Sequence, residues 1–591
     1  MNSDPKQSGS EIPAAAGLES TGSNRRSRGY RRHPSNYQVL QAQSEPLVWG
    51  TGGALIIALI MIVGLLTFII WEGMATFWPR PIQQMTLLGD KIVLGEVLDQ
   101  ENYKPDGGFL DNQSSELKPV LTAASEANSG VLQRYLVRGS NSSGNREDQW
   151  FWDATIEETE IPTWAVVVER TEESRIYGRL EGIRTDGQAS TDLDAAWTKF
   201  EELHGPALAS HEAVKSLEKY ELGRVNRAAK QTDLLARKLG ATDSRVTERR
   251  ATEAAERRDI ESQITAERKN YAQDFLLVRV YSGQNAEGLL KEVPLREIIR
   301  VVTPNRAGLG SKIGTYIARW WEFVSSSPRD ANMEGGVFPC IWGTVMMTLF
   351  MSLLVSPFGV LAALYLREYA QPGPIVSMIR IAINNLAGVP SIVFGAFGLV
   401  FFCYWIGKPI DRIFFAEETA ANVAVFGKGG LLWASLTMAL LTLPVVIVAT
   451  EEALAAVPNS MREGSYACGA GKWQTIRRIV LPRALPGIMT GLILAMARGA
   501  GEVAPLMLVG VMQTAPELPV DTVPPYVHLE RGFMHLSYHI YSVGFSSQNT
   551  DAAKPLVMTA TLLLIGIITT LNIVAVWLRN QLRRRYQSNQ F

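Results

Sequence analysis

Long apolar runs separated by polar stretches divide this chain of 591 residues into membrane-type and soluble-type segments. The first run, Leu47 to Trp71, is nearly uncharged, and about 25 residues at 1.5 Å per residue are enough to cross a bilayer core of roughly 30 Å. Five further candidate spans follow: Val337 to Leu366, about Ile375 to Ile406, Gly430 to Thr450, Ala484 to Met512, and Pro555 to Leu578. The pattern therefore predicts six transmembrane helices.

Residues 72–336, between the first two spans, are polar and contain no candidate span. Short runs of β-branched and aromatic residues, such as those from Thr163 to Ile183, predict strands. A stretch rich in Ala, Glu, Arg and Lys at about 208–269, broken at Gly240 and Asp243, predicts a helical hairpin. The predicted fold class is mainly α, a polytopic membrane protein with six transmembrane helices plus a mixed α/β extracytoplasmic domain inserted between helices 1 and 2.

The distribution of basic residues predicts which side of the membrane each segment occupies. Arginines gather in the N-terminal tail (1–46), which we expect to be disordered, in the loop at 460–483, and in the C-terminal tail (579–591). By the positive-inside rule these segments are cytoplasmic, so both termini face the cytoplasm and residues 72–336 lie outside the inner membrane. Lys312 to Val324 carries two Trp and apolar residues at helical spacing, which predicts a helix at the membrane interface.

Composition excludes several classes of function. The formal net charge of −1 gives no indication of a nucleic-acid partner. Cys340, Cys403 and Cys468 have neither metal-ligand spacing nor a place in the polar segment, so we expect buried or incidental thiols. His535 and His539 have an i, i+4 spacing that can bind zinc, but no third ligand is evident nearby, and we predict no metal site. No Ser-His-Asp or Cys-His arrangement can be placed, so we do not expect an enzyme.

The stretch from Ala467 to Gly487 contains Gly-Ala-Gly-Lys, which is close to the phosphate-binding loop of ATPases. That loop requires Gly, four residues, and then Gly-Lys followed by Ser or Thr. Here Trp473 follows Gly471 and Lys472, and Tyr466 stands where the first Gly is required. We therefore expect no ATP and no other cofactor to be bound by this chain.

The same stretch resembles the EAA loop of ABC-importer permeases, whose pattern is Glu-Ala-Ala, three residues, Gly, nine residues, and Ile-x-Leu-Pro. Gly464 and Ser465 stand in place of the two alanines. The resemblance implies two short helices that dock onto a separate ATPase subunit, which would bind ATP and Mg. The matching positions of this coupling loop are Glu463, Gly469, Ile479, Leu481 and Pro482.

Three further stretches of the permease core (337–578) resemble the phosphate branch of this family, the PstA subunits. They are Gly343 to Ala370, Ile383 to Phe402, and Met496 to Gly510. The sister subunits, named PstC, share part of this pattern. The three stretches therefore indicate a phosphate permease first, and the PstA branch rather than the PstC branch second.

Two charged residues indicate an anion path. Arg498 falls near the middle of the predicted fifth span, where an ionised Arg costs roughly 2.5–3.5 kcal/mol and should face protein or water. Glu502 follows at i+4, and the resemblance implies that both residues line the phosphate pathway. The alternative is a structural ion pair between spans. Asn384, Asn385 and Ser391 are further pathway candidates near the third span, with a packing kink or an interfacial helix as the alternative.

We therefore expect the permease subunit of an ATP-driven importer that moves inorganic phosphate across the bacterial inner membrane by alternating access. The resemblance implies a heterodimer with a PstC-like permease, a dimer of PstB-like ATPase subunits, and a periplasmic phosphate-binding protein. One alternative is a permease for another oxyanion, such as sulfate or molybdate. The other is a membrane-anchored envelope sensor or scaffold.

Overall fold

The computed structural model describes residues 45–588 apart from 106–107, 142, 285, 421, 516, 522–525 and 548. The predicted N-terminal tail therefore lies outside the described residues, except for its last two positions. The chain divides into two compact units, residues 1–67 and residues 68–591. Helix α2 (Glu45–Ala75) begins in the first unit and ends in the second.

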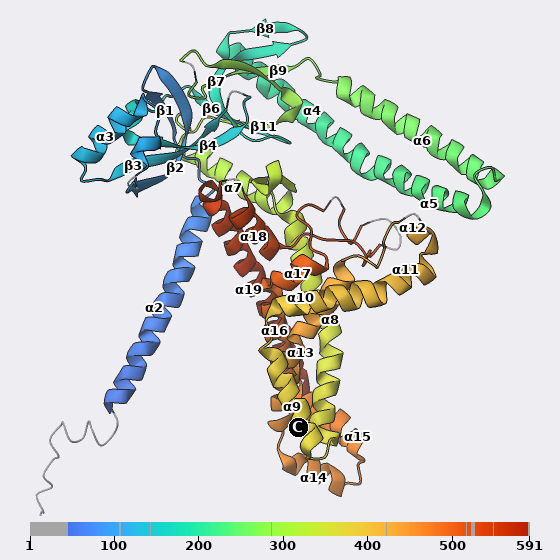
Figure 1. The fold of residues 1–591 in the computed structure, drawn as a ribbon. Helices are drawn as coiled ribbons and strands as arrows, with labels where there is room; N and C mark the ends of the chain where they lie inside the picture. The colour runs from blue at the N-terminus through green and yellow to red at the C-terminus, as the bar shows by residue number, and fades with distance from the viewer. Residues whose placement is uncertain are drawn as a thin grey trace, which may run out of the picture. The chain divides into compact units, whose positions relative to one another are not determined.

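Two antiparallel sheets form the core of the inserted domain, which belongs to the second unit (Figure 1). The first sheet has the strand order β4–β3–β2–β1–β5, and the second has the order β10–β9–β7–β6–β11, with β8 paired to β7. The strands of the first sheet are β1 (Ile82–Leu87), β2 (Lys91–Tyr103), β3 (Leu132–Ser140), β4 (Arg146–Trp152) and β5 (Ile156–Glu160). The strands of the second are β6 (Ala165–Arg170), β7 (Ile176–Thr185), β8 (Gln188–Ser190), β9 (Phe275–Val280), β10 (Leu289–Pro294) and β11 (Ile298–Val302). A short ribbon follows, made of β12 (Pro328–Arg329) and β13 (Glu334–Gly335).

Residues 165–168 of strand β6 are buried on both faces, which explains their unbroken apolar sequence. Val166 and Val168 pack in the cluster beneath helix α4 (Leu193–Ser216), together with Phe200 of that helix. Val167, on the opposite face, packs with residues of the first sheet. Because successive side chains of a strand point to opposite faces, this stretch, covered on both sides, has apolar residues at successive positions.

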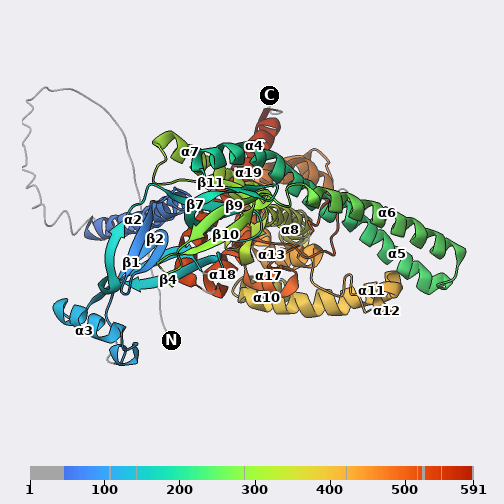
Figure 2. The ribbon, with the colours of Figure 1, turned by 90° about the horizontal axis from the view of Figure 1, so that it is seen from above.

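The predicted helical hairpin is present and extends away from the sheets (Figures 1 and 2). Its turn includes Gly240, whose φ of +94° is in a region that favours glycine. The Asp243 carboxylate then accepts a hydrogen bond from the backbone N–H of Arg245 at 2.9 Å, which caps the second arm. The first arm begins before the predicted residue 208, because α4 continues through a π-helical segment. The segments after α4 are η3 (Leu217–Leu222), α5 (Gly223–Leu239) and α6 (Ser244–Lys269).

Six helices among the described residues are long and apolar enough to cross a membrane, as predicted. They lie at Trp49–Ala75, Phe338–Tyr369, Ser391–Phe414, Leu431–Ala455, Lys472–Gly501 and Thr550–Gln581. The second to fifth of them contain α8 (Phe338–Leu364) with η6 (Tyr365–Tyr369), α10 (Ser391–Gly398) with η7 (Leu399–Gly407) and α11 (Lys408–Phe414), α13 (Leu431–Ala455), and α15 (Lys472–Thr475) with η8 (Ile476–Val480) and α16 (Leu481–Gly501). The sixth lies in α19 (Thr550–Ser588). The remaining helices are α3 (Leu117–Ala127), α7 (Leu309–Ser325), α9 (Pro374–Ala387), α12 (Ala416–Ala420), α14 (Asn459–Ala467), α17 (Ala504–Val509) and α18 (Leu536–Ser546).

Two spans differ most from their predicted bounds. The third, predicted from about Ile375 to Ile406, separates into α9 and a later span, because Gly388 and Pro390 interrupt the helix. The fifth, predicted as Ala484 to Met512, begins earlier and ends at Gly501, where the chain becomes extended at the next residue. Both differences matter, because each break lies beside candidate pathway residues.

Helix α13 lies at the centre of the membrane helices, with α8 and α16 packed against it and α19 against α16 (Figures 1 and 2). Glycines allow this close approach. A Cβ on Gly359 of α8 would lie 2.6 Å from Val446 of α13, and one on Gly491 of α16 would lie 2.3 Å from Ala449. Small residues at such positions let helices in a membrane gain van der Waals contact along their backbones.

Candidate functional site

The predicted anion pair lies where helix α16 ends. Arg498 precedes the last residue of α16, Gly501, by three positions, and Glu502 follows in an extended conformation. The predicted mid-span position of Arg498 is therefore wrong, because the helix breaks at Glu502. The two side chains nevertheless face each other, with Nε of Arg498 3.7 Å from Oε1 of Glu502.

This pair is loosely held. The side chain of Arg498 is 43% exposed and that of Glu502 is 22% exposed. Within the described part of the chain, the guanidinium of Arg498 makes no hydrogen bond, and its contact with Glu502 is too long to count as one. A planar fork of N–H donors is therefore left open beside a helix break, and this geometry suits a tetrahedral oxyanion.

The polar residues near the third span lie at the other helix break. Asn384 and Asn385 are exposed at the end of α9, and Ser391 is half-buried at the start of α10. Among the described residues, no hydrogen bond or ion pair joins these three side chains to the anion pair. The exposure of the two asparagines leaves them available to a ligand or to another subunit.

The two helix breaks are nevertheless packed together. A Cβ on Gly395 of α10 would lie 2.6 Å from Cα of Pro505 in α17, so the two short helices cross at close range. Leu386, before the first break, and Val389, within it, pack in the same apolar cluster as Leu506, which follows the second break. The structure thus brings the two interrupted segments together, although they are far apart in sequence.

The predicted coupling loop folds as two short helices, α14 and α15. Gly469 lies in the turn between them with a φ of +81°, a conformation that favours glycine. Glu463 is exposed on α14, whereas Ile479 and Leu481 are half-buried beyond α15. Pro482 lies in the first turn of α16. The loop therefore presents one exposed face while its far end joins the fifth span without a break.

A buried pair of hydroxyls joins the two helices of the loop. Oγ of Ser465 lies 2.8 Å from Oγ1 of Thr475, and Thr475 also donates to the carbonyl of Gly471 at 3.2 Å. Both side chains are buried. Ser465 occupies one of the positions where the EAA pattern has alanine, and its hydroxyl is satisfied there by a partner within the loop.

Arg462 anchors the loop to the membrane helices. Its Nη2 lies 2.9 Å from Oε1 of Glu368 in η6, at the end of the second span. The same guanidinium donates to the carbonyls of Val457 at 2.6 Å and Leu454 at 2.9 Å, at the end of α13. A cation at a helix C-terminus satisfies carbonyls that have no partner within the helix. The loop is thereby connected to two spans besides the one it enters.

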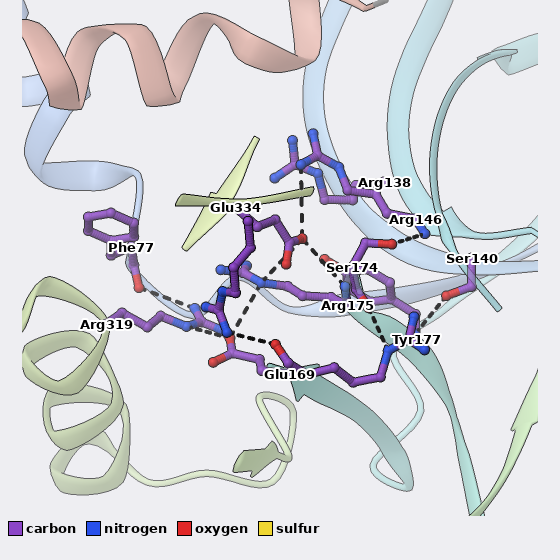
Figure 3. Close-up of polar contacts among 12 residues, drawn as sticks. Phe77, Arg138, Ser140, Arg146, Glu169, Ser174, Arg175, Tyr177, Arg319 and Glu334 are labelled. Carbon is purple, nitrogen blue, oxygen red and sulfur yellow. Dashed lines mark hydrogen bonds and ion pairs between the residues drawn. The ribbon is translucent and has the colours of Figure 1, made fainter. Parts of the chain in front are cut away.

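A second group of charged side chains, the junction cluster, lies where the inserted domain meets α7 (Figure 3). At its centre is Glu169 of β6, which accepts a hydrogen bond from Nε of Arg319 at 2.9 Å and also pairs with Arg300. Arg319 of α7 donates in addition to the carbonyl of Phe77 at 3.2 Å. The members of the cluster are Arg138, Arg146, Asp148, Glu169, Arg175, Arg300, Arg319, Glu322, Arg329 and Glu334.

The cluster also reaches the last span. Arg138 of β3 lies 2.9 Å from Asp148 and donates to the carbonyl of Ala552, in the first turn of α19, at 3.0 Å. Glu334 lies 3.9 Å from Arg175 and 4.0 Å from Arg146, so one carboxylate connects two parts of the cluster (Figure 3). The inserted domain is thus held to helices of the membrane half by hydrogen-bonded charges.

Two carboxylates of the cluster stay ionised despite their burial. Burial alone would raise the pKa of Glu169, but the guanidinium groups of Arg319, Arg175 and Arg300 hold that pKa well below its ordinary value. Burial opposes ionisation of Asp148 in the same way, but Arg138 and Arg146 lower the pKa of that carboxyl. Nothing in the sequence indicated this cluster, because its members come from distant segments and each resembles an ordinary solvated charge.

These features define a class of protein: a multi-pass membrane protein with interrupted spans around a charged pair and a two-helix loop between two spans. The family described as "Binding-protein-dependent transport system inner membrane component" matches residues 355–588. The "Phosphate transport system permease protein PstA 1" of Mycobacterium tuberculosis is 33% identical over 267 residues, which cover 45% of this chain and 78% of that protein. The chain belongs to this family of ABC-importer permeases.

Within that family, the predicted resemblance to the PstA branch is confirmed by relatives of that name. The "Phosphate transport system permease protein PstA" of Mycobacterium leprae is 38% identical over 192 residues, 32% of this chain. The match spans 57% of that relative's own length. A solved structure of the MetNI methionine ABC transporter is 18% identical and covers 41% of this chain and 94% of that one, with a TM-score of 0.29, at which the likeness supports no argument.

Proposed function

We propose that this chain is the permease subunit of an ATP-driven importer that moves inorganic phosphate across the inner membrane by alternating access. The observation that carries the proposal is Arg498, whose half-exposed guanidinium at a helix break has no hydrogen bond among the described residues, in a chain whose relatives are named phosphate permeases. The chain itself performs no chemistry on its substrate.

As the anion passes, Arg498 would exchange its contact with Glu502 for a contact with the anion. Phosphate oxygens accept hydrogen bonds from the guanidinium of Arg498 in the bidentate geometry that carboxylates use. While the anion is bound, its hydrogen bonds to Arg498 replace the long contact between Arg498 and Glu502. When the anion moves on, Glu502 again neutralises the arginine, so the site does not hold the anion tightly. Asn384, Asn385 and Ser391 line the same path from the other helix break.

The coupling loop would transmit movement of the partner ATPase to the membrane spans. A partner ATPase dimer, PstB-like, binds ATP and Mg and docks on the exposed face that carries Glu463. Tyr466 and Trp473 are 42% and 56% exposed in the two loop helices, and exposed aromatic residues are typical of interface anchors. Arg462 passes a displacement of the loop to Glu368 and the end of α13, which adjoin the packed core of the spans.

The remaining partners follow from the proposed function. A PstC-like permease completes the path as a heterodimer, and a periplasmic phosphate-binding protein delivers the anion from outside. Both termini then face the cytoplasm, and the inserted domain lies in the periplasm.

Uptake of radiolabelled phosphate in cells that lack the gene tests the proposal. The cells are complemented with the wild type, with Arg498→Ala, or with Lys428→Ala as a control cation on an exposed loop, at matched membrane levels. We expect the wild type and Lys428→Ala to restore phosphate uptake and Arg498→Ala to fail. Sulfate and molybdate are measured in parallel. Restoration of one of those anions instead of phosphate would favour the other-oxyanion permease, and no transport phenotype at all would favour the sensor or scaffold.

A further inference from the structure

Helix α7 lies at the level where membrane spans end. The hydroxyl of Tyr316 donates to the carbonyl of Met74, at the end of α2, at 3.0 Å. At the other end of α7, the backbone N–H of Val337 donates to the carbonyl of Phe323 at 2.7 Å, directly before α8 begins. One face of α7 therefore packs against the last residues of one span and the first residues of the next (Figure 1).

An apolar face of α7, turned away from Arg319 and Glu322, is largely exposed within the described residues. Leu309, Ile313, Ile317 and Trp321 recur every four residues and are 73%, 47%, 60% and 73% exposed. We call these four residues the α7 stripe. A helix with one apolar face, placed at the ends of membrane spans, lies in the plane of the membrane interface with that face among the lipids.

A cavity of about 620 Å³ opens at the C-terminal end of the stripe. Ala318 and Trp321 of α7 line it, so the stripe and the cavity are continuous. Leu208 and Ile299 add apolar surface from α4 and β11, and three consecutive serines, 325–327, add hydroxyls. The volume is in the range of sites that take a small ligand or a headgroup.

The charge of the cavity favours an anion. Its lining includes four cations, Lys215, Lys219, Arg300 and Arg329, against two carboxylates, Glu212 and Glu322. Glu322 already pairs with both arginines. The two lysines come from the opposite wall, on α4 and η3, and both are exposed. Lys215 lies 3.9 Å from the exposed carboxylate of Glu172, a long contact that leaves its ammonium able to reach a ligand.

We propose that this cavity binds the phosphate-bearing headgroup of an anionic phospholipid, whose acyl chains lie along the α7 stripe. Lys215 and Lys219 pair with the headgroup, and the hydroxyl of Ser327 donates to its oxygens. The hydroxyls of Ser325 and Ser326 donate to the carbonyls of Trp321 at 2.7 Å and Glu322 at 2.6 Å. Because Glu322 connects the cavity to the junction cluster, the bound lipid holds the inserted domain at a fixed height above the spans. This site is separate from the anion path and does not depend on which anion is transported.

Lipid retention by the purified full chain tests the proposal. The chain is reconstituted in nanodiscs that contain phosphatidylglycerol and phosphatidylethanolamine, extracted in mild detergent, and examined by native mass spectrometry for bound lipid. A lysine near an anionic membrane contributes a factor of about five in affinity, so K215A/K219A should retain phosphatidylglycerol roughly thirtyfold more weakly than the wild type. The matched control K230A/R237A removes two exposed cations of the hairpin and should retain it normally. Equal retention by all three proteins would overturn the proposal.

Two further measurements separate other occupants. Inorganic phosphate that displaces the lipid at millimolar concentration would mean that the cavity holds free phosphate instead. A fluorophore attached at Ile317→Cys, with exposed Cys468 replaced by Ser, reports what covers the stripe. We expect quenching by brominated lipids in nanodiscs, and an equivalent label at exposed Ser262 of the hairpin should stay unquenched. A label at 317 that lipids do not quench, but that a PstC-like subunit shields, would mean that a protein covers the stripe and would contradict the proposal.

Discussion

The charges of the inserted domain and those of the membrane half are arranged in opposite ways. In the junction cluster, the side chains of Glu169 and Arg319 are 6% and 4% exposed, and their closest contact is 2.7 Å. In the membrane half, Arg498 and Glu502 are partly exposed, and their contact is a full ångström longer, at 3.7 Å. Among the described residues, the charges of the junction cluster have many partners, whereas Arg498 and Glu502 have few.

This difference teaches how to separate structural charges from the charges that we propose for transport. Buried ions pay a large desolvation cost, so they persist only where every charge is paired and hydrogen-bonded. A group that must bind a passing anion cannot be saturated in that way, because its donors have to be free when the anion arrives. The exposed fraction and the number of partners therefore predict which charges maintain the fold and which take part in transport.

The largest expected effect is a loss of folding stability. Glu169→Gln removes the carboxylate that Arg319, Arg300 and Arg175 face, and it leaves buried cations without their partner. Breaking a buried pair in this way typically costs about 3–5 kcal/mol. Chemical unfolding of the full chain in detergent should show a loss of that size. The control Glu261→Gln breaks an exposed pair with Arg257 on α6 and should change stability by less than about 0.5 kcal/mol. Equal losses of stability in the two variants would contradict the claim that the buried cluster stabilises the fold more than an exposed ion pair does.

The second effect is on transport. Arg498→Ala should lower phosphate uptake by about a hundredfold, or roughly 2.7 kcal/mol, because the anion loses a charged donor. The free energy of unfolding should change by less than about 1 kcal/mol, because the pair is partly exposed and long. Arg498→Lys keeps the charge but loses the planar fork, so its phosphate uptake should lie between that of the wild type and that of Arg498→Ala. A stability loss as large as that of Glu169→Gln would place Arg498 among the structural charges.

The sequence predicted the parts of this contrast that depend on local pattern. Long apolar runs gave all six spans, and Gly240 with Asp243 placed the hairpin turn, because a run of side chains or a cap is a property of neighbouring residues. The end of α16 was missed because the residues from 503 to 512 are almost entirely apolar, so hydropathy continues across the break. Arg498 was consequently placed in mid-span.

The junction cluster could not be predicted for a different reason. Arg319 and Glu169 are separated by 150 positions, and they meet only after two sheets and α7 have packed together. Arg462 and Glu368 are 94 positions apart, and their pairing likewise depends on tertiary structure. A charged residue in a polar segment carries no local sign of burial, so single-sequence patterns treat it as solvated.

A third, smaller effect follows from pH. Glu169 has a pKa below its ordinary value of 4.5 in the folded chain, so its contribution to stability is present above pH 4.5 and is lost as the pH falls toward the folded pKa. The wild type should therefore lose about 1.4 kcal/mol more per pH unit below roughly pH 4 than Glu169→Gln, which has no proton to gain there. Unfolding of both proteins is measured between pH 7 and pH 3. Parallel curves would show that Glu169 does not titrate with a lowered pKa.

The smallest expected effect concerns a pair that lies between the two extremes. Arg227 of the hairpin contacts Glu517 of the loop before α18 at 2.6 Å, and the two side chains are 29% and 39% exposed. The short distance resembles the contacts of the junction cluster, but the exposure resembles that of Arg498 and Glu502. If exposure decides the energy, a double-mutant cycle of Arg227→Ala and Glu517→Ala should give a coupling of about 0.2–1 kcal/mol. Arg531 also pairs with Glu517 at 3.1 Å, so the cycle is repeated with Arg531→Ala to remove the competing partner. A coupling near 3 kcal/mol in either background would show that distance decides the energy rather than exposure, and would assign the hairpin contact to the charges that maintain the fold.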